Sequence, residues 1–213
     1  GKEGVAVCEA EYFRFSPQAV PDGEGGALVA WQDYRGAGPK IYCQKIGPAG
    51  DILWSKNGVQ LCAETAEQAD PKIIPDMKGG AFVVWEDYKH GKPRVFCQKI
   101  NNGGAAEWGP SGRRAGTGGG GQSSPRMING GAGGVIIVWM EVNRGASDIF
   151  AQQIGSDGNA QWDAGGVLVC GAGNSQRLPQ IITDGDGGAI VLWEDYRQYR
   201  AGNSDILVQR IDS

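Results

Sequence analysis

The chain has 213 residues, of which 40% are hydrophobic and 37 are glycines, and its formal net charge is -4. This length allows one large domain or two small ones, and the weak acidic balance without a long basic run argues against a nucleic-acid partner. No apolar stretch approaches the roughly 18–20 residues that cross a bilayer, so no membrane span is predicted.

The first predicted element is a short apolar strand at 4–8 (GVAVC), and 25–35 (GGALVAWQDYR) follows it. Nearly the same string returns as GGAFVVWEDYK at 79–89, GGVIIVWMEVN at 133–143 and GGAIVLWEDYR at 187–197. Repeats of this kind define a whole architecture. A spacing of 54 residues separates Trp31, Trp85, Trp139 and Trp193, then Pro17, Pro71, Pro125 and Pro179, and then Gln44, Gln98 and Gln152.

The second copy shows the elements of one repeat in order. Residues 71–76 (PKIIPD) predict a strand that a glycine-containing hairpin turn closes, and 81–85 (AFVVW) predict a strand covered on both faces. Residues 94–100 (RVFCQKI) predict a third strand. A fourth short strand is clearest in other copies, as GVQLC at 58–62 and GVLVC at 166–170. No window keeps the apolar spacing of a helix.

Four strands in about 50 residues are typical of a β-propeller blade. We therefore predict an all-β, four-bladed β-propeller, a single domain over 1–213. Its blades lie at about 17–62, 71–116, 125–170, and 179–213 plus 4–8. The chain ends on a third-strand sequence at 205–211 (DILVQRI), so the N-terminal strand at 4–8 is predicted to complete the last blade and close the ring. The alternative is a fragment of a larger ring.

The repeat P-x-I-x-x-D-x-x-G-G-A-x-x-x-W-x-D-Y-R is carried most fully by PKIIPDMKGGAFVVWEDYK at 71–89 and PQIITDGDGGAIVLWEDYR at 179–197. It resembles the β-propeller repeats of bacterial secreted and cell-surface proteins. The resemblance implies an extracellular or cell-surface propeller without fixing an activity, because such repeats occur in proteins of many roles. The third copy departs most, since WMEVN replaces WEDYR.

Five cysteines fall on predicted third strands (Cys43 and Cys97) and fourth strands (Cys8, Cys62 and Cys170). A register that pairs Ile46 with Val59 places Cys43 opposite Cys62, which makes a disulfide between them geometrically plausible. The alternative is that a small apolar residue suits this column. An odd number also leaves room for a bridge between chains. No C-x-x-C spacing occurs, so neither a metal nor another cofactor is predicted.

One face of the predicted propeller collects the loops between second and third strands and the loops between blades. Tyrosine and basic residues recur in these loops, and such residues are enriched at contact hot spots. The predicted face for a glycan, an acidic polymer or another protein comprises Tyr34, Arg35, Tyr88, Lys89, Tyr196, Arg197, Tyr199 and Arg200. The alternative is a solvated rim in which these side chains stack for stability.

The opposite face is predicted to carry three tryptophans at a fixed spacing, Trp54, Trp108 and Trp162. Such side chains stack on sugars in binding sites. The alternative is that they fill the space between blades, since every repeat buries its flanks against its neighbours.

No catalytic residues are predicted. The acid of W-x-D recurs in every copy, as expected of a turn cap, and His90 is the only histidine. No pair of carboxylates is singled out, as a glycosidase requires. We therefore predict a non-enzymatic extracellular module for protein interaction or structural assembly, whose partners are other proteins or copies of itself. The alternative is a lectin-like carbohydrate-binding propeller, and a glycosidase-type enzyme is the third hypothesis.

Overall fold

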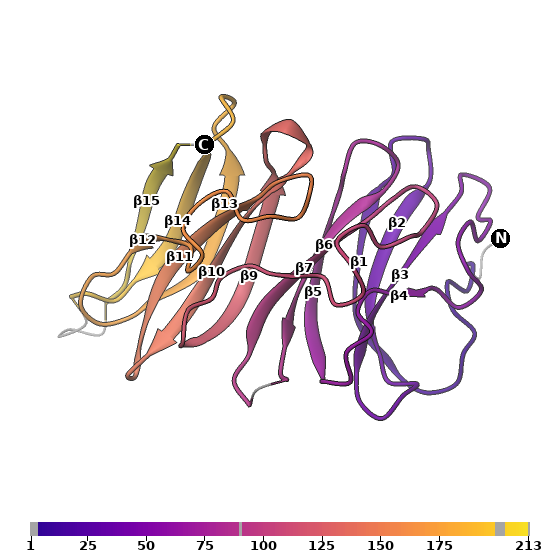
Figure 1. Ribbon diagram of the computed structural model, residues 1–213, viewed down its shortest axis with the longest axis horizontal. Helices are drawn as coiled ribbons and strands as arrows, with labels where there is room; N and C mark the ends of the chain where they lie inside the picture. The colour runs from indigo at the N-terminus through magenta and orange to yellow at the C-terminus, as the bar shows by residue number, and fades with distance from the viewer. Residues whose placement is uncertain (1–3, 90, 199–202, 213) are drawn as a thin grey trace. The chain divides into compact units, whose positions relative to one another are not determined.

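The computed structural model describes residues 4–89, 91–198 and 203–212. Within these residues, strands form four antiparallel sheets, joined by loops and one short 3₁₀ turn at Gly131–Gly133 (Figure 1). The prediction of an all-β chain is therefore confirmed. The described part of the chain contains no helix that is long and apolar enough to cross a membrane.

Each sheet is built from strands that follow one another in the chain. The first contains β1 (Arg14–Pro21), β2 (Ala27–Asp33), β3 (Lys40–Ile46) and β4 (Val59–Gln60). The second contains β5 (Gln68–Pro75), β6 (Ala81–Asp87), β7 (Arg94–Ile100) and β8 (Arg113–Arg114). The third contains β9 (Gly121–Asn129), β10 (Val135–Asn143), β11 (Ala146–Ile154) and β12 (Val167–Cys170). The fourth contains β13 (Gln176–Thr183), β14 (Ala189–Asp195) and β15 (Asp205–Ile211).

The first strand of each sheet starts before the proline at which we placed the start of the blade. Each of these strands pairs with a break in register around that proline, as a β-bulge does. The residue before the proline has a positive φ: 51° at Ser16, 50° at Asp70, 55° at Ser124 and 51° at Leu178. Proline cannot donate to the ladder, and a bulge is one of the few places where a strand tolerates it.

A buried carboxylate closes the end of the second strand in each sheet. Asp33 accepts hydrogen bonds from Trp31 Nε1 at 2.9 Å and from the backbone nitrogen of Arg35 at 3.0 Å. Asp195 accepts the same two bonds, each at 3.0 Å, from Trp193 and Arg197. The acid of W-x-D therefore joins its own tryptophan to the following loop, which is the turn-cap role.

In the third sheet this position is taken by the longer side chain of Glu141. Gln122 Nε2 and the Gly120 nitrogen both donate to its carboxylate at 3.0 Å, and Trp139 Nε1 donates at 3.4 Å. A Cβ atom on Gly118 would overlap this carboxylate. The run of glycines at 118–121 therefore makes room for the longer acid.

The chain divides into two compact units, Gly1–Lys89 with Cys97–Arg113 and His90–Phe96 with Arg114–Ser213. We refer to them as the first and the second compact unit. In the second, Val138, Ile149 and Ala151 of the third sheet form a buried cluster with Val191 and Trp193 of the fourth. The prediction of a single domain over 1–213 stays a prediction.

The fourth sheet differs from the others in having three described strands. Its edge strand β15 exposes 71% of Ile206 and 61% of Val208, whereas Ile149 and Ala151, at the matching positions of β11, are fully buried. Residues 4–8 belong to no strand. The predicted pairing that would close a ring is therefore not among the described strand pairs.

The predicted Cys43–Cys62 disulfide is wrong, because all five cysteines are free. Strand β4 pairs with β3 so that Cys43 faces Val59, three residues from the register we expected. The end of β3 is already used by the loop that follows it, through the Ile46–Ile52 bridge and a bond from the Leu53 nitrogen to the Lys45 carbonyl. Burial raises the pKa of the Cys43 and Cys97 thiols, so both stay neutral.

A pair of neighbouring glycines tests the fit around Glu141. Gly118→Ala should lower the free energy of unfolding by about 1–3 kcal/mol, because the added methyl group displaces the buried carboxylate. Gly119→Ala is the matched control: a Cβ there meets no atom within 4 Å, so its effect should stay within about 0.5 kcal/mol. Urea unfolding of both variants measures the difference, and equal stabilities would contradict this account of the loop.

Candidate functional site

The predicted face is built from the loop after each second strand. In the first repeat, Tyr34 is 37% exposed and meets the ring of Phe15 edge-on at 5.4 Å between centroids. Arg35 lies 2.6 Å from the carboxylate of Asp33, and its guanidinium lies 3.9 Å from the centre of the Tyr42 ring. Arg35 is thus neutralised by the turn-capping acid.

The second repeat keeps the tyrosine but replaces the arginine with Lys89. Tyr88 donates its hydroxyl to Glu86 at 2.8 Å, and Lys89 pairs with Glu64 at 2.6 Å. Burial and the hydrogen bond to Glu86 raise the pKa of Tyr88 to about 12, so the phenol remains protonated.

The fourth repeat reproduces this arrangement in the second compact unit. Tyr196 donates its hydroxyl to Glu194 at 2.9 Å, and Arg197 donates two bonds of 2.7 Å to Asp195. The hydrogen bond from Arg197 lowers the pKa of Asp195 to about 2, so this pair stays ionised at neutral pH. His90, Tyr199 and Arg200 lie outside the described residues.

A cavity of about 330 Å³ opens beside Tyr196. Its walls are formed by Gly145, Ala146, Asn174, Ser175, Arg177 and Tyr196. The guanidinium carbon of Arg177 lies 5.1 Å from the centre of the Tyr196 ring, so cation and ring form one wall. We did not predict Arg177. The sequence did contain a signal for it, because the residue two positions before the repeated proline is Phe15, Ala69 or Ser123 in the other repeats and is basic in the fourth repeat alone.

Backbone hydrogen bonds fix the loops around this cavity. The Tyr196 nitrogen donates to the Ser175 carbonyl at 2.9 Å, and the Asn174 side chain donates to the Arg197 carbonyl at 3.1 Å. Asn174 has a φ of 64°, a conformation that asparagine tolerates better than most residues. The loop before β13 and the loop after β14 are therefore held together, and the cavity has preformed walls.

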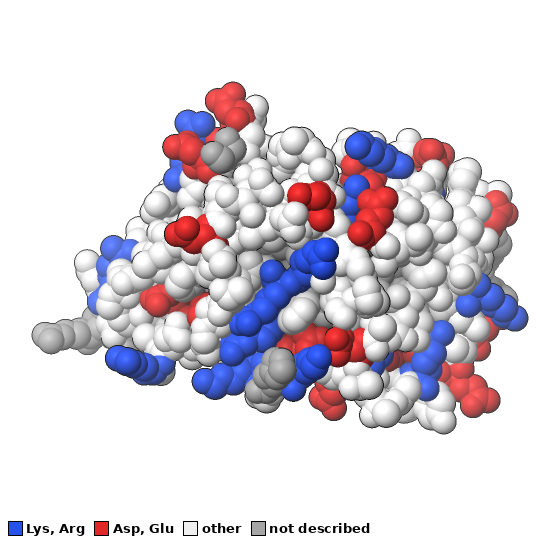
Figure 2. Space-filling view, in the orientation of Figure 1, with Lys and Arg blue, Asp and Glu red and all other residues white. Residues whose placement is uncertain are grey.

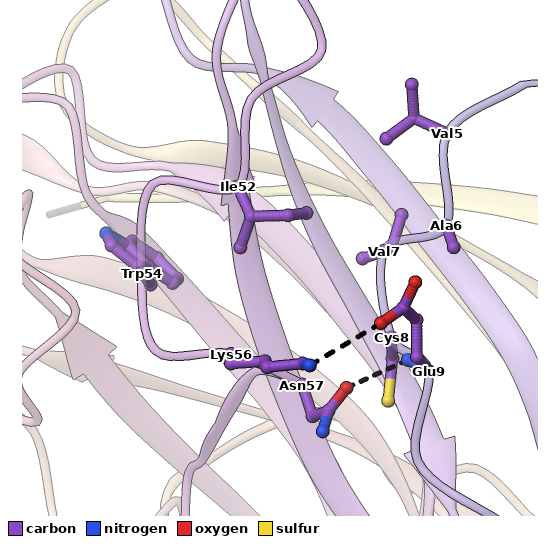
Figure 3. Close-up of a pocket in the computed structure, with 9 residues that line it drawn as sticks. All are labelled: Val5, Ala6, Val7, Cys8, Glu9, Ile52, Trp54, Lys56 and Asn57. Atoms are coloured by element: carbon purple, nitrogen blue, oxygen red, sulfur yellow. Dashed lines mark hydrogen bonds and ion pairs between the residues drawn. The ribbon is translucent and has the colours of Figure 1, made fainter.

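A second cavity, of about 500 Å³, lies in the first compact unit between the segment 5–9 and the loop after β3 (Figure 3). Val7 and Ile52 lie on its two sides, and Lys56 reaches toward Glu9 at 3.7 Å. The Glu9 nitrogen also donates to the side chain of Asn57 at 2.8 Å. Two contacts thus tie the N-terminal segment to the first sheet.

The cysteine at the end of this segment has a counterpart in the other compact unit. Arg35 Nη2 donates to Cys8 Sγ at 3.1 Å, and Arg197 Nη2 donates to Cys170 Sγ at 3.4 Å. Cys170 is the last residue of β12, an outer strand. Residues 5–8 therefore lie beside the first sheet in the way that β12, the outer strand of the third sheet, lies beside the fourth sheet.

Two of the three predicted sugar-stacking tryptophans are buried. Trp54 is 8% exposed and donates its Nε1 to the Asn102 carbonyl at 2.8 Å, and Trp108 is 1% exposed and packs on Phe82. Trp162 is half-buried. This placement favours the packing alternative for Trp54 and Trp108.

Charge is distributed unevenly over the surface. Figure 2 shows lysine and arginine side chains in several separate groups, one of them elongated, with aspartate and glutamate groups between them. The net charge of -4 therefore coexists with locally positive surface. Among the residues that the structure describes, no three His, Cys, Asp or Glu side chains come together as a set that could hold a metal ion.

The fold resembles solved glycoside hydrolases. An endo-arabinase from Bacteroides thetaiotaomicron VPI-5482 is 14% identical, with a TM-score of 0.51 over 92% of this chain and 74% of that one. A thermostable family-43 glycoside hydrolase is 13% identical, with a TM-score of 0.50 over 94% and 72%. A β-fructofuranosidase from Bombyx mori is 14% identical, with a TM-score of 0.51 over 92% and 47%. The sequence matches no protein-family model, and no curated protein is significantly similar to it.

At these identities the likeness shows the fold, that of a β-propeller. It also corrects our functional expectation. The prediction of a non-enzymatic module for interaction or assembly is wrong, as is the prediction that the chain is not an enzyme, because the structures sharing its fold are glycoside hydrolases. The lack of a catalytic column misled us, since a repeat pattern cannot reveal a residue that functions only once.

Proposed function

We propose that this protein is a carbohydrate-active β-propeller of the glycoside hydrolase type, which binds a glycan in the cavity beside Tyr196. The observation that carries this proposal is the preformed cavity, whose wall combines an aromatic ring with polar side chains from two loops. The fold likeness supports it, because carbohydrate chemistry is what the similar structures share.

The cavity suits a sugar ring for a chemical reason. A pyranose presents C–H groups on its faces and hydroxyl groups around its edge, so an aromatic wall and hydrogen-bonding groups serve its two sides. Tyr196 provides the ring, and Asn174, Ser175 and Arg177 provide polar atoms around it. The volume of about 330 Å³ matches a mono- or disaccharide portion of a longer chain.

Hydrolysis is the second candidate function, and the carboxylate of Asp148 favours it. The matching positions hold Lys40 in the first repeat, Arg94 in the second and Asp205 in the fourth, so an acid stands here in the third and fourth repeats. Asp148 faces Glu141 across β10 and β11, and burial and the charge of Glu141 raise its pKa. Glycoside hydrolysis pairs a carboxylic acid of raised pKa with an ionised carboxylate. In this proposal Asp148 is the proton donor.

An extracellular location belongs to the same proposal. The structural polysaccharides of cell walls lie outside the cell membrane, and the repeat resembles those of secreted and cell-surface propellers. The glycan is then the partner, in place of the protein partners expected from the sequence.

We also propose that Gly4–Cys8 closes the propeller as the outer strand of the fourth sheet. The edge of β15 supports this, because burying Ile206 and Val208 contributes about 1.5–3 kcal/mol for each side chain. The register follows from the third sheet, where Ala151 pairs with Val167. By the spacing of the repeats, Val208 then pairs with Val5.

Two tyrosines in the same local setting test glycan binding. Tyr196→Ala should abolish binding to the soluble polysaccharide that the wild type binds best, because it removes the aromatic wall. Tyr88→Ala is the matched control, since Tyr88 also donates to a glutamate two residues earlier yet lines no described cavity. A panel of arabinan, xylan, fructan and pectin in affinity electrophoresis measures binding, and reducing-sugar release from the same panel measures hydrolysis. Equal loss in both variants, or no binding by the wild type, would contradict the proposed site.

Closure is tested by a cross-link. Val5→Cys with Val208→Cys, in a background with Cys8 and Cys170 replaced by serine, should form an intramolecular disulfide on mild oxidation. Non-reducing electrophoresis should show a monomer that migrates faster, and Val5→Cys alone serves as the control. No cross-link would contradict closure by this strand, and a dimer would assign the strand to a second copy.

A further inference from the structure

Each described cation of the predicted face is paired with an acid. Arg35 and Arg197 lie 2.6 and 2.7 Å from the turn-capping aspartates, and Lys89 lies 2.6 Å from Glu64. A guanidinium or ammonium group held in this way has little to offer a charged ligand. Several described cations form no such pair, and one of them lines the cavity beside Tyr196.

Arg177 is such a cation. In the part of the chain that the structure describes, it forms no ion pair, and its side chain is exposed. Glu194 lies opposite it across β13 and β14, but the carboxylate of Glu194 accepts the hydroxyl of Tyr196. Glu194, the acid opposite Arg177 in the sheet, therefore forms a hydrogen bond with the tyrosine and no ion pair with the arginine.

The backbone aims Arg177 into the cavity. It stands next to the β-bulge, where the register breaks between Arg177 and Gln180 and Leu178 has a φ of 51°. Bulges redirect a side chain away from the regular alternation of a strand. The Tyr196 ring then restrains the guanidinium, which leaves the N–H edge of its plane for a ligand.

Among the described residues that line the cavity, none carries a carboxylate. Arg144, adjacent to the lining residue Gly145, also forms no ion pair among the described residues and is exposed. A neutral sugar needs no positive charge, and an unneutralised arginine beside a polar cavity is suited to a planar anion, which it binds through two parallel hydrogen bonds.

We propose that the cavity selects an acidic glycan, and that Arg177 binds the carboxylate of a uronic acid whose ring lies against Tyr196. This rests on the proposed glycan-binding function and adds the class of sugar. The sequence explains why the fourth repeat would carry this site and the others would not. The position of Arg177 holds Phe15, Ala69 and Ser123 in the other repeats, so the fourth repeat alone combines this cation with the tyrosine.

The test compares two forms of one polymer. Polygalacturonate and its fully methyl-esterified form share a backbone, but the ester carries no charge. The wild type should bind polygalacturonate about tenfold more tightly by isothermal titration calorimetry, and Arg177→Gln should remove that preference while keeping the weaker binding. Arg210→Gln is the control for net charge, because Arg210 is exposed and already paired with Asp184.

The outcomes separate this inference from the function on which it rests. Equal wild-type affinity for the two polymers, or a preference that survives Arg177→Gln, would overturn the assignment of an acidic glycan but leave glycan binding intact. Preference for chondroitin sulfate over polygalacturonate would replace the carboxylate with a sulfate ester and overturn the uronic acid. Absence of binding to every polysaccharide, acidic or neutral, would overturn the proposed function and this inference with it.

Discussion

The buried carboxylate two residues after each strand tryptophan is the interaction on which the sheets depend. In the first and fourth sheets it accepts the indole N–H and a backbone nitrogen of the following loop, so one side chain joins the core of a sheet to the loops at its edge. A buried indole donor or carboxylate without a partner costs several kcal/mol, so in these two sheets the indole and the carboxylate satisfy each other, and in the third sheet Trp139 donates to Glu141. When the acid becomes Glu141, the change is accommodated in the glycine run beside it and not in the core.

A scaffold repeated in this way leaves function to the positions that differ. Arg177 stands in a column where the other repeats have different chemistry, and it lies in the second compact unit. The tyrosine of W-x-D-Y is common to three repeats, but a cavity forms beside Tyr196, where the bulge, the Asn174 turn and Arg177 come together. A residue common to the repeats, Tyr196, therefore forms part of the cavity wall, and a residue found in one repeat only, Arg177, provides the charge.

The order of strands could be predicted from the sequence, because glycine turns and apolar runs recur at a constant spacing. The start of each first strand could not, since a proline normally ends a ladder and here it is tolerated at a bulge. The Cys43 register failed for a related reason: the loop carrying Trp54 already pairs with the end of β3, so β4 pairs three residues further back.

The candidate site was predicted only in part. Tyr196 and its face follow from the geometry of a blade, whereas the cavity depends on a left-handed Asn174 and on a bulge that re-aims Arg177. The turn at Asn174 has no counterpart in the periodic pattern, and the proline column marks the bulge without showing which side chain it redirects. The functional class was missed for the same reason, because periodicity identifies the scaffold and says little about residues that occur once.

The most direct measurement is a crystal structure of the protein with a galacturonic acid oligosaccharide. The account predicts density for the sugar between Arg177 and Tyr196, with its carboxylate on the guanidinium, and none beside the repeat-related Tyr34 or Tyr88. A sugar bound equally at all three tyrosines, or held elsewhere with this cavity empty, would contradict the claim that function lies where the repeat is broken.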